Sequence, residues 1–285
     1  MPELPEVETV CRGIEAMVVG TRIAEVQIRR SDLRLEIPAN FGQMITGRTI
    51  LSVKRRAKFI LLGLEQERSI ILHLGMSGSL TIRRPGDEPR TAAESKHDHV
   101  VWHLEGAGQA IAWDMFYNDP RRFGLIQLAE TVPWEAHPVL SGLGLEPLSE
   151  DFSVQALSQM LEGKKTAIKQ LLLDQRLIVG IGNIYAAEIL YRAQISPLRA
   201  ANSLQPAEIR KLHQAIGTVL EEAIQAGGSS LRNYVQASGE LGYFQHHWAV
   251  YGRSGKPCPN CNCDGGVQQF VQNGRSSFWC PTRQS

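Results

Sequence analysis

Apolar residues recur at helical spacing close to the start of the chain, and a proline stands just ahead of them. The positions are Val7, Val10, Cys11, Ile14 and Met17 or Val18. Pro5 suits the first turn of such a helix, where a missing N–H costs nothing. The pattern therefore predicts a short extended arm that leads into an amphipathic helix, with Cys11 as an ordinary buried residue of its apolar face.

From residue 22 to about 129 the pattern changes to short β-rich runs separated by glycine, proline and charged residues. Examples are KFILLGL, SIILHLGM, GSLTIRR, HVVWHL and AIAW. Short strands at regular spacing indicate a β-sandwich or a barrel. A Pro- and Gly-rich stretch at 131–150 marks a domain boundary, and helical runs follow it. The tail from about residue 244 returns to short β and turn signals, so the fold class is α+β.

Composition places the chain among globular proteins, because 43% of its 285 residues are hydrophobic and 21% are charged. No run approaches the roughly 20 apolar residues of a membrane helix, and the start lacks the features of a signal peptide. We therefore expect a cytoplasmic protein without a membrane partner. A net charge of +1 gives no hint of nucleic acid, but residues 48–58 hold five basic residues and no acidic one.

The N-terminus could carry covalent chemistry. Removal of Met1 would leave Pro2 as a free secondary amine, and an α-amine has a pKa of roughly 8, well below that of lysine. Such an amine can attack an acetal-like carbon and form a cationic iminium. Glu3 and Glu6 stand beside it and could move protons or hold the amine. The alternative is an ordinary arm with acids near a helix start.

Three further groups of residues have chemical potential. Lys58, in KRRAKF, is by itself typical of a solvated strand edge. Met76 and the pair Arg121 and Phe123 fall in glycine-containing turns, where they could fill a gap in a stack of DNA bases; the alternative is that Met76 and Phe123 belong to the core. His97 and His99 could suggest a metal or lie on the surface, and no carboxylate pattern supports a metal there.

Residues 164–193 combine two helical runs with a turn that contains Gly180 and Gly182. Asn183 opens the second run, and the exposed N–H groups of a helix start can bind phosphate. Lys164 and Lys165 stand at the start of the first run. The alternative is a plain helical hairpin.

Four of the five cysteines crowd the tail: Cys258, Cys261, Cys263 and Cys280. In a cytosolic chain such crowding indicates a metal before a disulfide, and the spacing is similar to that of a zinc ribbon. The usual second pair is broken, because its last position is Arg283.

Taken together, these motifs resemble the bacterial formamidopyrimidine-DNA glycosylases over essentially the whole chain. PELPEVETV, RRAKF, HLGMSGSL, KHDHV, DPRRFG, VGIGNIYAAE, YGR and the cysteine-rich tail follow one another in the family's order. Related endonuclease VIII-type enzymes begin PEGPE, whereas this chain begins PELPE after Met1. The resemblance implies removal of oxidised purines such as 8-oxoguanine and formamidopyrimidines, with AP lyase activity through β- and δ-elimination.

The resemblance also implies roles for individual residues. Pro2 would be the Schiff-base nucleophile, Glu3 the general acid, and Glu6 a support for both. Lys58 would assist β-elimination, and Arg275 would assist δ-elimination and grip phosphate. The DNA contacts would be His97, Arg121, Lys164 and Asn183, the void-filling residues Met76, Arg121 and Phe123, and the loop Ser238–Phe244 would cover the flipped base.

A domain scheme follows from the same resemblance. Residues 1–130 would form a catalytic β-sandwich with an N-terminal helix, 131–150 a linker, 151–243 a helix–two-turn–helix domain, and 244–285 a zinc-finger-like β-hairpin. The partner would be double-stranded DNA with oxidised bases, bound by a monomer at the nucleoid.

The family's zinc site reads C-x2-C, sixteen residues, C-x2-C. Here Cys261 and Cys280 enclose eighteen residues, whereas Cys263 and Cys280 enclose sixteen. A structural zinc held by Cys258, Cys261, Cys263 and Cys280 is therefore one expectation. The other is a metal-free hairpin held by Phe270, Phe278 and Trp279.

Two other functions remain open from the sequence. One is a sister enzyme for oxidised pyrimidines. The other is a non-catalytic DNA-binding protein that kept the scaffold, although intact Pro2, Glu3 and Lys58 speak against it.

Overall fold

The computed structural model describes residues 1–87, 91–108, 110–130, 133–229, 242–261 and 263–285. Its contacts divide the chain into two compact units. The first contains Met1–Ser141 and Ala226–Tyr243, and the second contains Gly142–Gln225 and Phe244–Ser285. Each unit is described by itself below.

The first unit begins with helix α1, Leu4–Val18. Pro5 stands in its first turn, where the helix does not need the missing N–H. The apolar stripe predicted from the sequence is buried, with Val7, Ile14 and Val18 fully shielded from solvent. Cys11 is also buried, and burial together with nearby Glu8 raises the pKa of its thiol to about 12. It is therefore an unreactive residue of the helix's apolar face, as expected.

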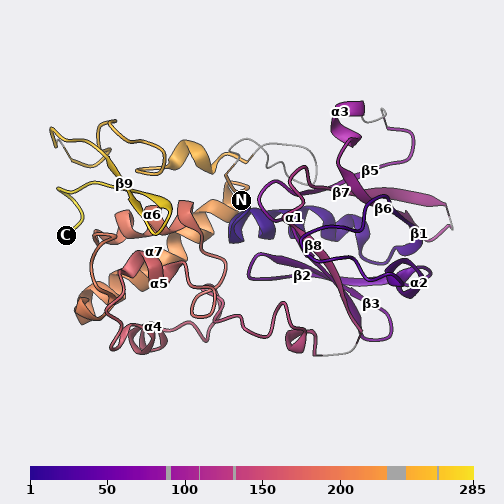
Figure 1. The fold of residues 1–285 in the computed structure, drawn as a ribbon, viewed down its shortest axis with the longest axis horizontal. Helices are drawn as coiled ribbons and strands as arrows, with labels where there is room; N and C mark the ends of the chain where they lie inside the picture. Colours follow the sequence, from indigo (N-terminus) through magenta and orange to yellow (C-terminus); the bar gives the residue numbers. More distant parts are fainter. Residues whose placement is uncertain (88–90, 109, 131–132, 230–241, 262) are drawn as a thin grey trace. The chain divides into compact units, whose positions relative to one another are not determined.

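Among the described residues, two four-stranded antiparallel sheets follow (Figure 1). One has the order β1-β6-β7-β5 and the other β2-β3-β4-β8. Their bounds are β1 Arg22–Ile28, β2 Ile50–Arg56, β3 Phe59–Leu64, β4 Arg68–His73, β5 Ser79–Arg83, β6 Asp98–Glu105, β7 Ile111–Asn118 and β8 Leu125–Ala129. The short helices α2 (Phe41–Ile45) and α3 (Ala92–Ser95) and a 3-10 turn at Trp134–Ala136 complete the unit.

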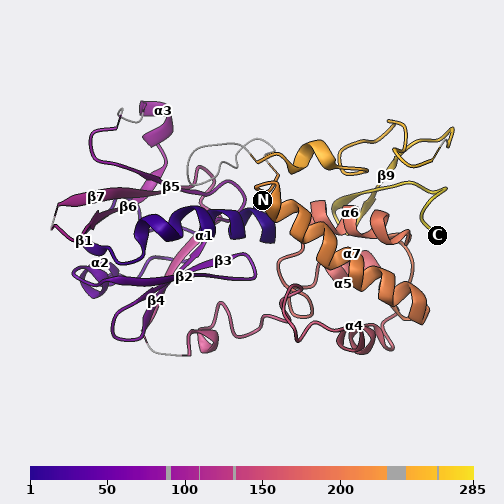
Figure 2. The ribbon, with the colours of Figure 1, turned by 180° about the vertical axis from the view of Figure 1, so that it is seen from behind.

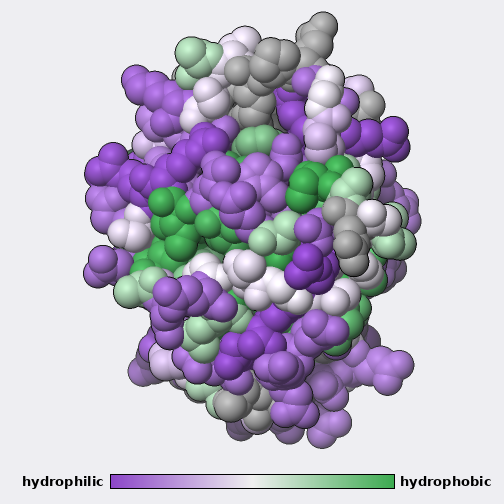
Figure 3. Space-filling model, turned by 90° about the vertical axis from the view of Figure 1, so that its right-hand side faces the viewer, coloured by the Kyte–Doolittle hydropathy of each residue, from purple (hydrophilic) through white to green (hydrophobic). Residues whose placement is uncertain are grey.

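A single hydrophobic core joins the two sheets and α1. Strand β6 contributes Val100, Trp102 and Leu104, which alternate along the strand and so share the face that points into this core. Strands β3 and β4 contribute Ile60, Leu62, Ile70 and Leu72 in the same alternation. An end view shows hydrophobic side chains in a band across a largely hydrophilic surface (Figure 3). Because the two sheets are separate and share one core, the first unit is a β-sandwich and not a barrel.

The second unit is mainly helical (Figure 2). Its helices are α4 Val154–Leu161, α5 Ile168–Leu172, α6 Asn183–Ala193 and α7 Pro206–Gln225, with 3-10 turns at Ala201–Ser203 and Phe244–His247. The turn between α5 and α6 is braced by Gln175, whose amide donates to the Ile181 carbonyl (2.9 Å) and accepts from the Gly180 N–H (2.9 Å). This is the helix–turn–helix arrangement that the glycine-containing motif predicted.

The C-terminal hairpin consists of β9, Gln268–Gln272, and β10, Arg275–Trp279. Asn273 and Gly274 form its turn with positive φ angles of 47° and 73°, as a tight two-residue hairpin requires. A small apolar cluster that includes Tyr191 of α6, Val250 and Val267 lies beneath it.

Glu188 of α6 fixes the segment that leads into this hairpin. Its buried carboxylate accepts the backbone N–H groups of Ala249 (2.9 Å), Val250 (3.0 Å) and Tyr251 (2.8 Å). Burial raises the pKa of Glu188, and the three N–H donors oppose that rise. One side chain therefore satisfies three donors of a loop that follows it by about sixty residues.

The α+β fold class with its sandwich and helical parts is confirmed, whereas the four-part domain scheme remains a prediction. That scheme placed residues up to 243 with the helices, while the contacts group Ala226–Tyr243 with the first unit. Within the described part of the chain, no helix has the length and apolar character needed to span a membrane.

We expect Glu188→Ala to lower the free energy of unfolding by about 3 kcal/mol, because three buried N–H groups lose their acceptor. Chemical denaturation would measure the change. Glu222→Ala is the control: its ion pair with Arg192 (2.8 Å) is half exposed, so we expect less than about 1 kcal/mol. Equal losses in the two variants would contradict the anchoring role of Glu188.

Candidate active site and DNA interface

The arm before α1 is held by a carboxylate. Glu6 accepts the backbone N–H of Glu3 (2.8 Å) with one oxygen and the backbone N–H of Ser229 (2.7 Å) with the other. Both acids are buried, with 3% of Glu3 and 2% of Glu6 exposed. Pro2 is buried as well, whereas Met1 is 47% exposed. The position of Pro2 is thus fixed through the backbone of its neighbour.

Gly228 makes the approach to Glu6 possible. Its φ is +77°, and a Cβ at this position would lie 3.1 Å from the Glu6 carboxylate and 3.2 Å from its Cα. A side chain there would therefore be strained and crowded at once. The chain can pass this close to the helix start because residue 228 is glycine.

Lys58 lies at the turn between β2 and β3 and is only 6% exposed. Ala57 before it adopts a φ of 53°, and its carbonyl accepts a hydrogen bond from Arg55 (3.0 Å). Arg55 also pairs with Glu8 of α1 (2.9 Å). The solvated-edge alternative for Lys58 is therefore wrong, because the side chain is buried.

His73 is a neighbour of Lys58 that sequence reasoning missed. Burial, with the positive charges of Lys58 and Arg34, lowers the pKa of His73 to about 4. Its Nδ1 accepts the N–H of Gly75 (2.9 Å), so the proton of the neutral ring is on Nε2. Its ring also lies 4.8 Å from that of Phe59, its cross-strand partner. The site thus holds a neutral N–H donor beside a buried lysine, and the HLGMSG motif was the available signal.

The two turns that carry the predicted void-filling residues lie side by side. A Cβ on Gly75 (φ +60°) would clash with the Gly124 nitrogen and with the Phe123 backbone. Met76 is 41% exposed and Phe123 46% exposed. Arg121 places its guanidinium 4.7 Å from the centre of the Phe123 ring. The core alternative for Met76 and Phe123 is therefore wrong.

The two histidines of KHDHV differ in their surroundings. His99 is buried, and its Nε2 donates to the Asp119 carbonyl (2.7 Å). His97 is half-buried, and its own carbonyl accepts the Asp119 N–H (3.1 Å). His99 is therefore a structural residue of the unit, and His97 remains available for an external contact.

In the second unit, Asn183 and a buried lysine hold the hairpin strand that begins with Arg275. The side-chain amide of Asn183 donates to the Ser276 carbonyl (2.9 Å). Lys169, fully buried, donates to the same carbonyl (2.9 Å) and to the Ser277 hydroxyl (2.7 Å). Arg275 itself is exposed. Sequence reasoning missed Lys169, which the pattern shows only as one more helical lysine.

Lys164 is also exposed and lies in the turn between α4 and α5. The loop predicted to cover a flipped base, Ser238–Phe244, is described only from Gly242 onward, so its first part lies outside the described residues.

The four tail cysteines converge. Their sulfur atoms all lie within 4.8 Å of one another, with 3.4 Å between Cys261 and Cys280 and 3.6 Å between Cys263 and Cys280. Four thiolates at about 2.3 Å from one zinc ion would be about 3.8 Å apart, so the cluster has a suitable size. Tyr191 contacts the Cys258 sulfur through its hydroxyl (3.2 Å). These four residues could hold a metal ion such as zinc.

Arg283 does not enter the cluster. Its guanidinium lies 5.3 Å from the centre of the Tyr191 ring, and its backbone N–H donates to the Cys280 carbonyl (3.2 Å). The hairpin aromatics named in the metal-free alternative also pack, because the rings of Phe270 and Trp279 are 6.3 Å apart. Cys263 supplies the fourth thiol that position 283 lacks.

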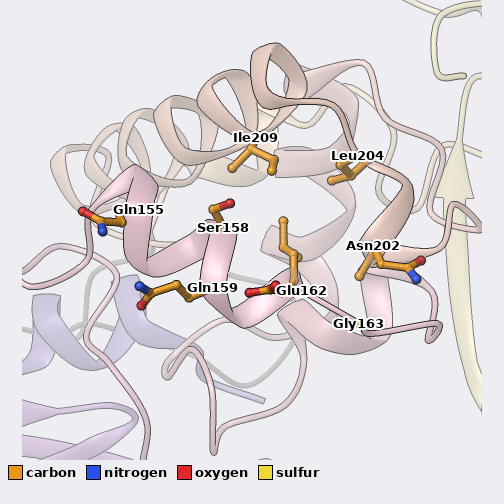
Figure 4. Close-up of a pocket in the computed structure, with 10 residues that line it drawn as sticks. Gln155, Ser158, Gln159, Glu162, Gly163, Asn202, Leu204 and Ile209 are labelled. Atoms are coloured by element: carbon orange, nitrogen blue, oxygen red, sulfur yellow. The ribbon is translucent and has the colours of Figure 1, made fainter.

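A pocket of about 470 Å³ in the second unit is unrelated to these groups (Figure 4). Its lining comes from α4, with Gln155, Ser158 and Gln159, and from the segment around Asn202 and Leu204. None of the predicted site residues lines it. This pocket therefore adds nothing to the candidate site.

Comparison with known proteins now decides the family. Residues 1–126 match the model of the formamidopyrimidine-DNA glycosylase N-terminal domain, and residues 143–235 match the H2TH domain of the same enzymes. The chain belongs to the formamidopyrimidine-DNA glycosylase family. It is thus a DNA glycosylase of base excision repair, from an enzyme family with glycosylase and AP lyase activity.

Relatives of similar length support this membership. The formamidopyrimidine-DNA glycosylase of Chelativorans sp. (strain BNC1) is 48% identical over 100% of both chains. The MutM (Fpg) protein of Thermus thermophilus has a TM-score of 0.85 and 39% identity over 99% of this chain and 98% of its own. A variant of Lactococcus lactis FPG, solved with a Fapy-dG-containing DNA, has a TM-score of 0.88 and 32% identity over 100% of both chains.

The pKa of His73 predicts a pH dependence of stability. The folded pKa of about 4 is below the ordinary 6.5, so the folded protein binds this proton less readily than the unfolded chain. The stability that neutral His73 contributes to the folded protein is therefore fully present above pH 6.5, and it is lost as the pH falls from 6.5 through 4. We expect His73→Gln to lose less unfolding free energy across this window than the unchanged protein, measured by urea denaturation. Identical pH profiles would contradict the assignment.

Proposed function

We propose that this glycosylase removes oxidised purines, such as 8-oxoguanine and formamidopyrimidines, from double-stranded DNA and cuts the strand through a Schiff base on Pro2. The observation that carries the proposal is the fixed N-terminus: Pro2 is buried beside Glu3, whose N–H is held by Glu6. A chain end fixed in this way can serve as a positioned nucleophile once Met1 is removed. We infer that the enzyme acts as a monomer.

The chemistry proceeds in three steps. The Pro2 amine attacks C1′ as the base leaves with a proton, and ring opening gives an iminium ion. Loss of a C2′ proton then breaks the C3′–O bond by β-elimination. A second elimination breaks the C5′–O bond and leaves a one-nucleotide gap, and in this last step water hydrolyses the iminium, which releases the sugar remnant as an unsaturated aldehyde and restores the Pro2 amine.

Each catalytic residue has a part that its surroundings support. Glu3 acts as the general acid close to the amine, and Glu6 keeps its acceptor oxygens engaged with backbone and so holds the arm. Lys58, buried beside neutral His73, contacts phosphate and shuttles a proton in β-elimination. Arg275, exposed at the start of β10, grips phosphate and assists δ-elimination.

DNA recognition divides into phosphate contacts and void filling. Lys164, Asn183 and His97 contact the backbone, which sets register without reading sequence. Met76, Arg121 and Phe123 occupy the space left when the damaged base is flipped, and flipping costs a few kcal/mol of unstacking. The exposure of Met76 and Phe123 supports this role, since exposed apolar side chains at turn tips are free to enter a base stack.

The choice of oxidised purines rests on the family and on one relative, the Lactococcus lactis protein that was solved with Fapy-dG-containing DNA. The alternative function as a plain DNA-binding scaffold is disfavoured by the burial of Glu3, Glu6 and Lys58. Buried charged groups are costly, and they are typical of catalytic sites.

The cysteine cluster would hold one structural zinc per chain through Cys258, Cys261, Cys263 and Cys280. Support comes from the sulfur spacing, which suits a tetrahedral site, and from Tyr191, whose hydroxyl contacts one sulfur. The zinc would fix the hairpin that presents Arg275 and takes no part in the reaction.

Borohydride trapping on duplex DNA with one 8-oxoguanine tests the nucleophile. We expect the enzyme to form a covalent complex, and Pro2→Gly to lose most of it, because a primary amine with different geometry replaces the proline. Parallel duplexes with oxidised pyrimidines rank the substrates. Full trapping by protein whose mass still includes Met1 would contradict the proposal, since the Pro2 nitrogen is then an amide.

Elemental analysis of protein purified without chelator tests the metal. We expect about one zinc per chain, and loss of that zinc in Cys280→Ser, because Cys280 contacts two other sulfur atoms of the cluster. Cys11→Ser is the matched control, because Cys11 lies in α1 of the other unit. Zinc-free protein with normal DNA binding would establish the metal-free hairpin instead.

A further inference from the structure

Asp119 is a buried carboxylate that none of the roles above uses. It follows β7, and none of its surface is exposed. One of its oxygens accepts the Ser77 hydroxyl (2.8 Å) and the Arg121 N–H (3.3 Å). The other accepts the Gly124 N–H (2.8 Å). A single side chain therefore bonds both turns that carry Met76, Arg121 and Phe123.

The hydrogen bonds around Asp119 form a network that links several residues to one another. The Ser77 hydroxyl also accepts the Arg121 N–H (3.2 Å), so the first turn is bonded directly to the second. The Asp119 carbonyl accepts from His99 (2.7 Å) and from the Arg122 N–H (3.2 Å). The residue is thus fixed to β6 as well as to the two turns.

Glycines let the two turns meet at this carboxylate. A Cβ on Gly124 would clash with the Tyr117 hydroxyl and the His73 carbonyl, and it would lie 3.1 Å from an Asp119 oxygen. Gly78 has no room for a Cβ against the Leu74 backbone. The turns are therefore packed backbone to backbone, and only their tips extend to solvent.

We propose that Asp119 is a positioning residue that joins Met76, Arg121 and Phe123 into one preformed wedge, which enters the base stack as a unit. This rests on the proposed function, in which these three side chains fill the void. Turns that are already ordered have lost their backbone conformational entropy, so insertion does not have to order the backbone of two separate loops. Hydrogen bonds to a buried carboxylate are among the stronger ones in proteins, so Asp119 can hold the two turns together while their side chains enter the base stack.

Two variants each remove one of the two groups that join the turns, the Asp119 carboxylate and the Ser77 hydroxyl. Asp119→Asn keeps the size of the side chain but removes one acceptor oxygen. Ser77→Ala removes the link between the turns and leaves the bond from Gly124 in place. Asp114→Asn is the matched control: Asp114 lies in β7 and pairs with His103 (2.6 Å), away from both turns.

Two measurements separate positioning from general damage. Stopped-flow fluorescence of 2-aminopurine next to a paired 8-oxoguanine reports insertion and flipping. Borohydride trapping on a single-stranded abasic site reports the amine chemistry without a base stack to enter. Thermal unfolding of each variant shows whether it is folded at the assay temperature.

We expect Asp119→Asn to slow the fluorescence phase by about 10- to 100-fold, as expected for misplaced groups at a site, with trapping on the single strand within about twofold of the unchanged enzyme. Ser77→Ala should show the same pattern to a smaller degree, and Asp114→Asn no change. Normal flipping in folded Asp119→Asn or Ser77→Ala would overturn the inference. So would equal losses on both substrates. Failure of the unchanged enzyme to trap any substrate would instead count against the proposed function.

Discussion

The Glu6 carboxylate is the constraint on which the N-terminal arm, and with it the proposed nucleophile, depends. A chain terminus is normally its most mobile part, and a nucleophile placed there needs external support. Glu6 provides it by accepting two backbone N–H groups, one from Glu3 beside Pro2 and one from Ser229, 223 residues after Glu6 itself. Since Gly228 has no side chain, that later segment can come this close. Glu6 therefore ties the N-terminal arm to the segment around Ser229, which is the later part of the first unit's sequence.

The same arrangement recurs beneath side chains to which we assign DNA contacts. Exposed groups such as Arg275 and Met76 cannot be rigid by themselves, so buried polar residues fix the backbone beneath them. Lys169 and Asn183 bind the Ser276 carbonyl next to Arg275, and Asp119 binds the turn that carries Met76. Glu188 does the same for the loop that leads into the hairpin. Buried charged groups are costly, and here each one is offset by several hydrogen bonds to backbone or hydroxyl groups.

The sequence predicted those features that depend on neighbouring residues alone, such as the extent of a helix and its apolar face. The run NIYAAEILYRA matches α6 residue for residue, and the apolar stripe of α1 is buried as its spacing required. Sequence reasoning failed where burial depends on distant segments. Lys58 by itself indicated a solvated edge, and nothing local marked Lys169 or Asp119 as buried. His73 was hidden in an apolar strand pattern, although its pKa depends on Lys58 and Arg34. Such contacts depend on the packing of the whole unit, which no short motif encodes.

The tail forms its last turn with Arg283 at the position where the zinc-ribbon pattern would place a fourth cysteine. Arg283 can bind no metal, because a guanidinium has no free lone pair. It instead lies over the Tyr191 ring, while Gln284 fixes the chain by bonding the Cys280 N–H (2.8 Å) and the Ile195 carbonyl (2.9 Å). The last turn is thus anchored without a cysteine at 283. Cys263 brings the cluster to four sulfur atoms that all lie within 4.8 Å of one another. Because hydrogen bonds hold the backbone around Cys280, the proposed zinc site does not need a ligand at position 283.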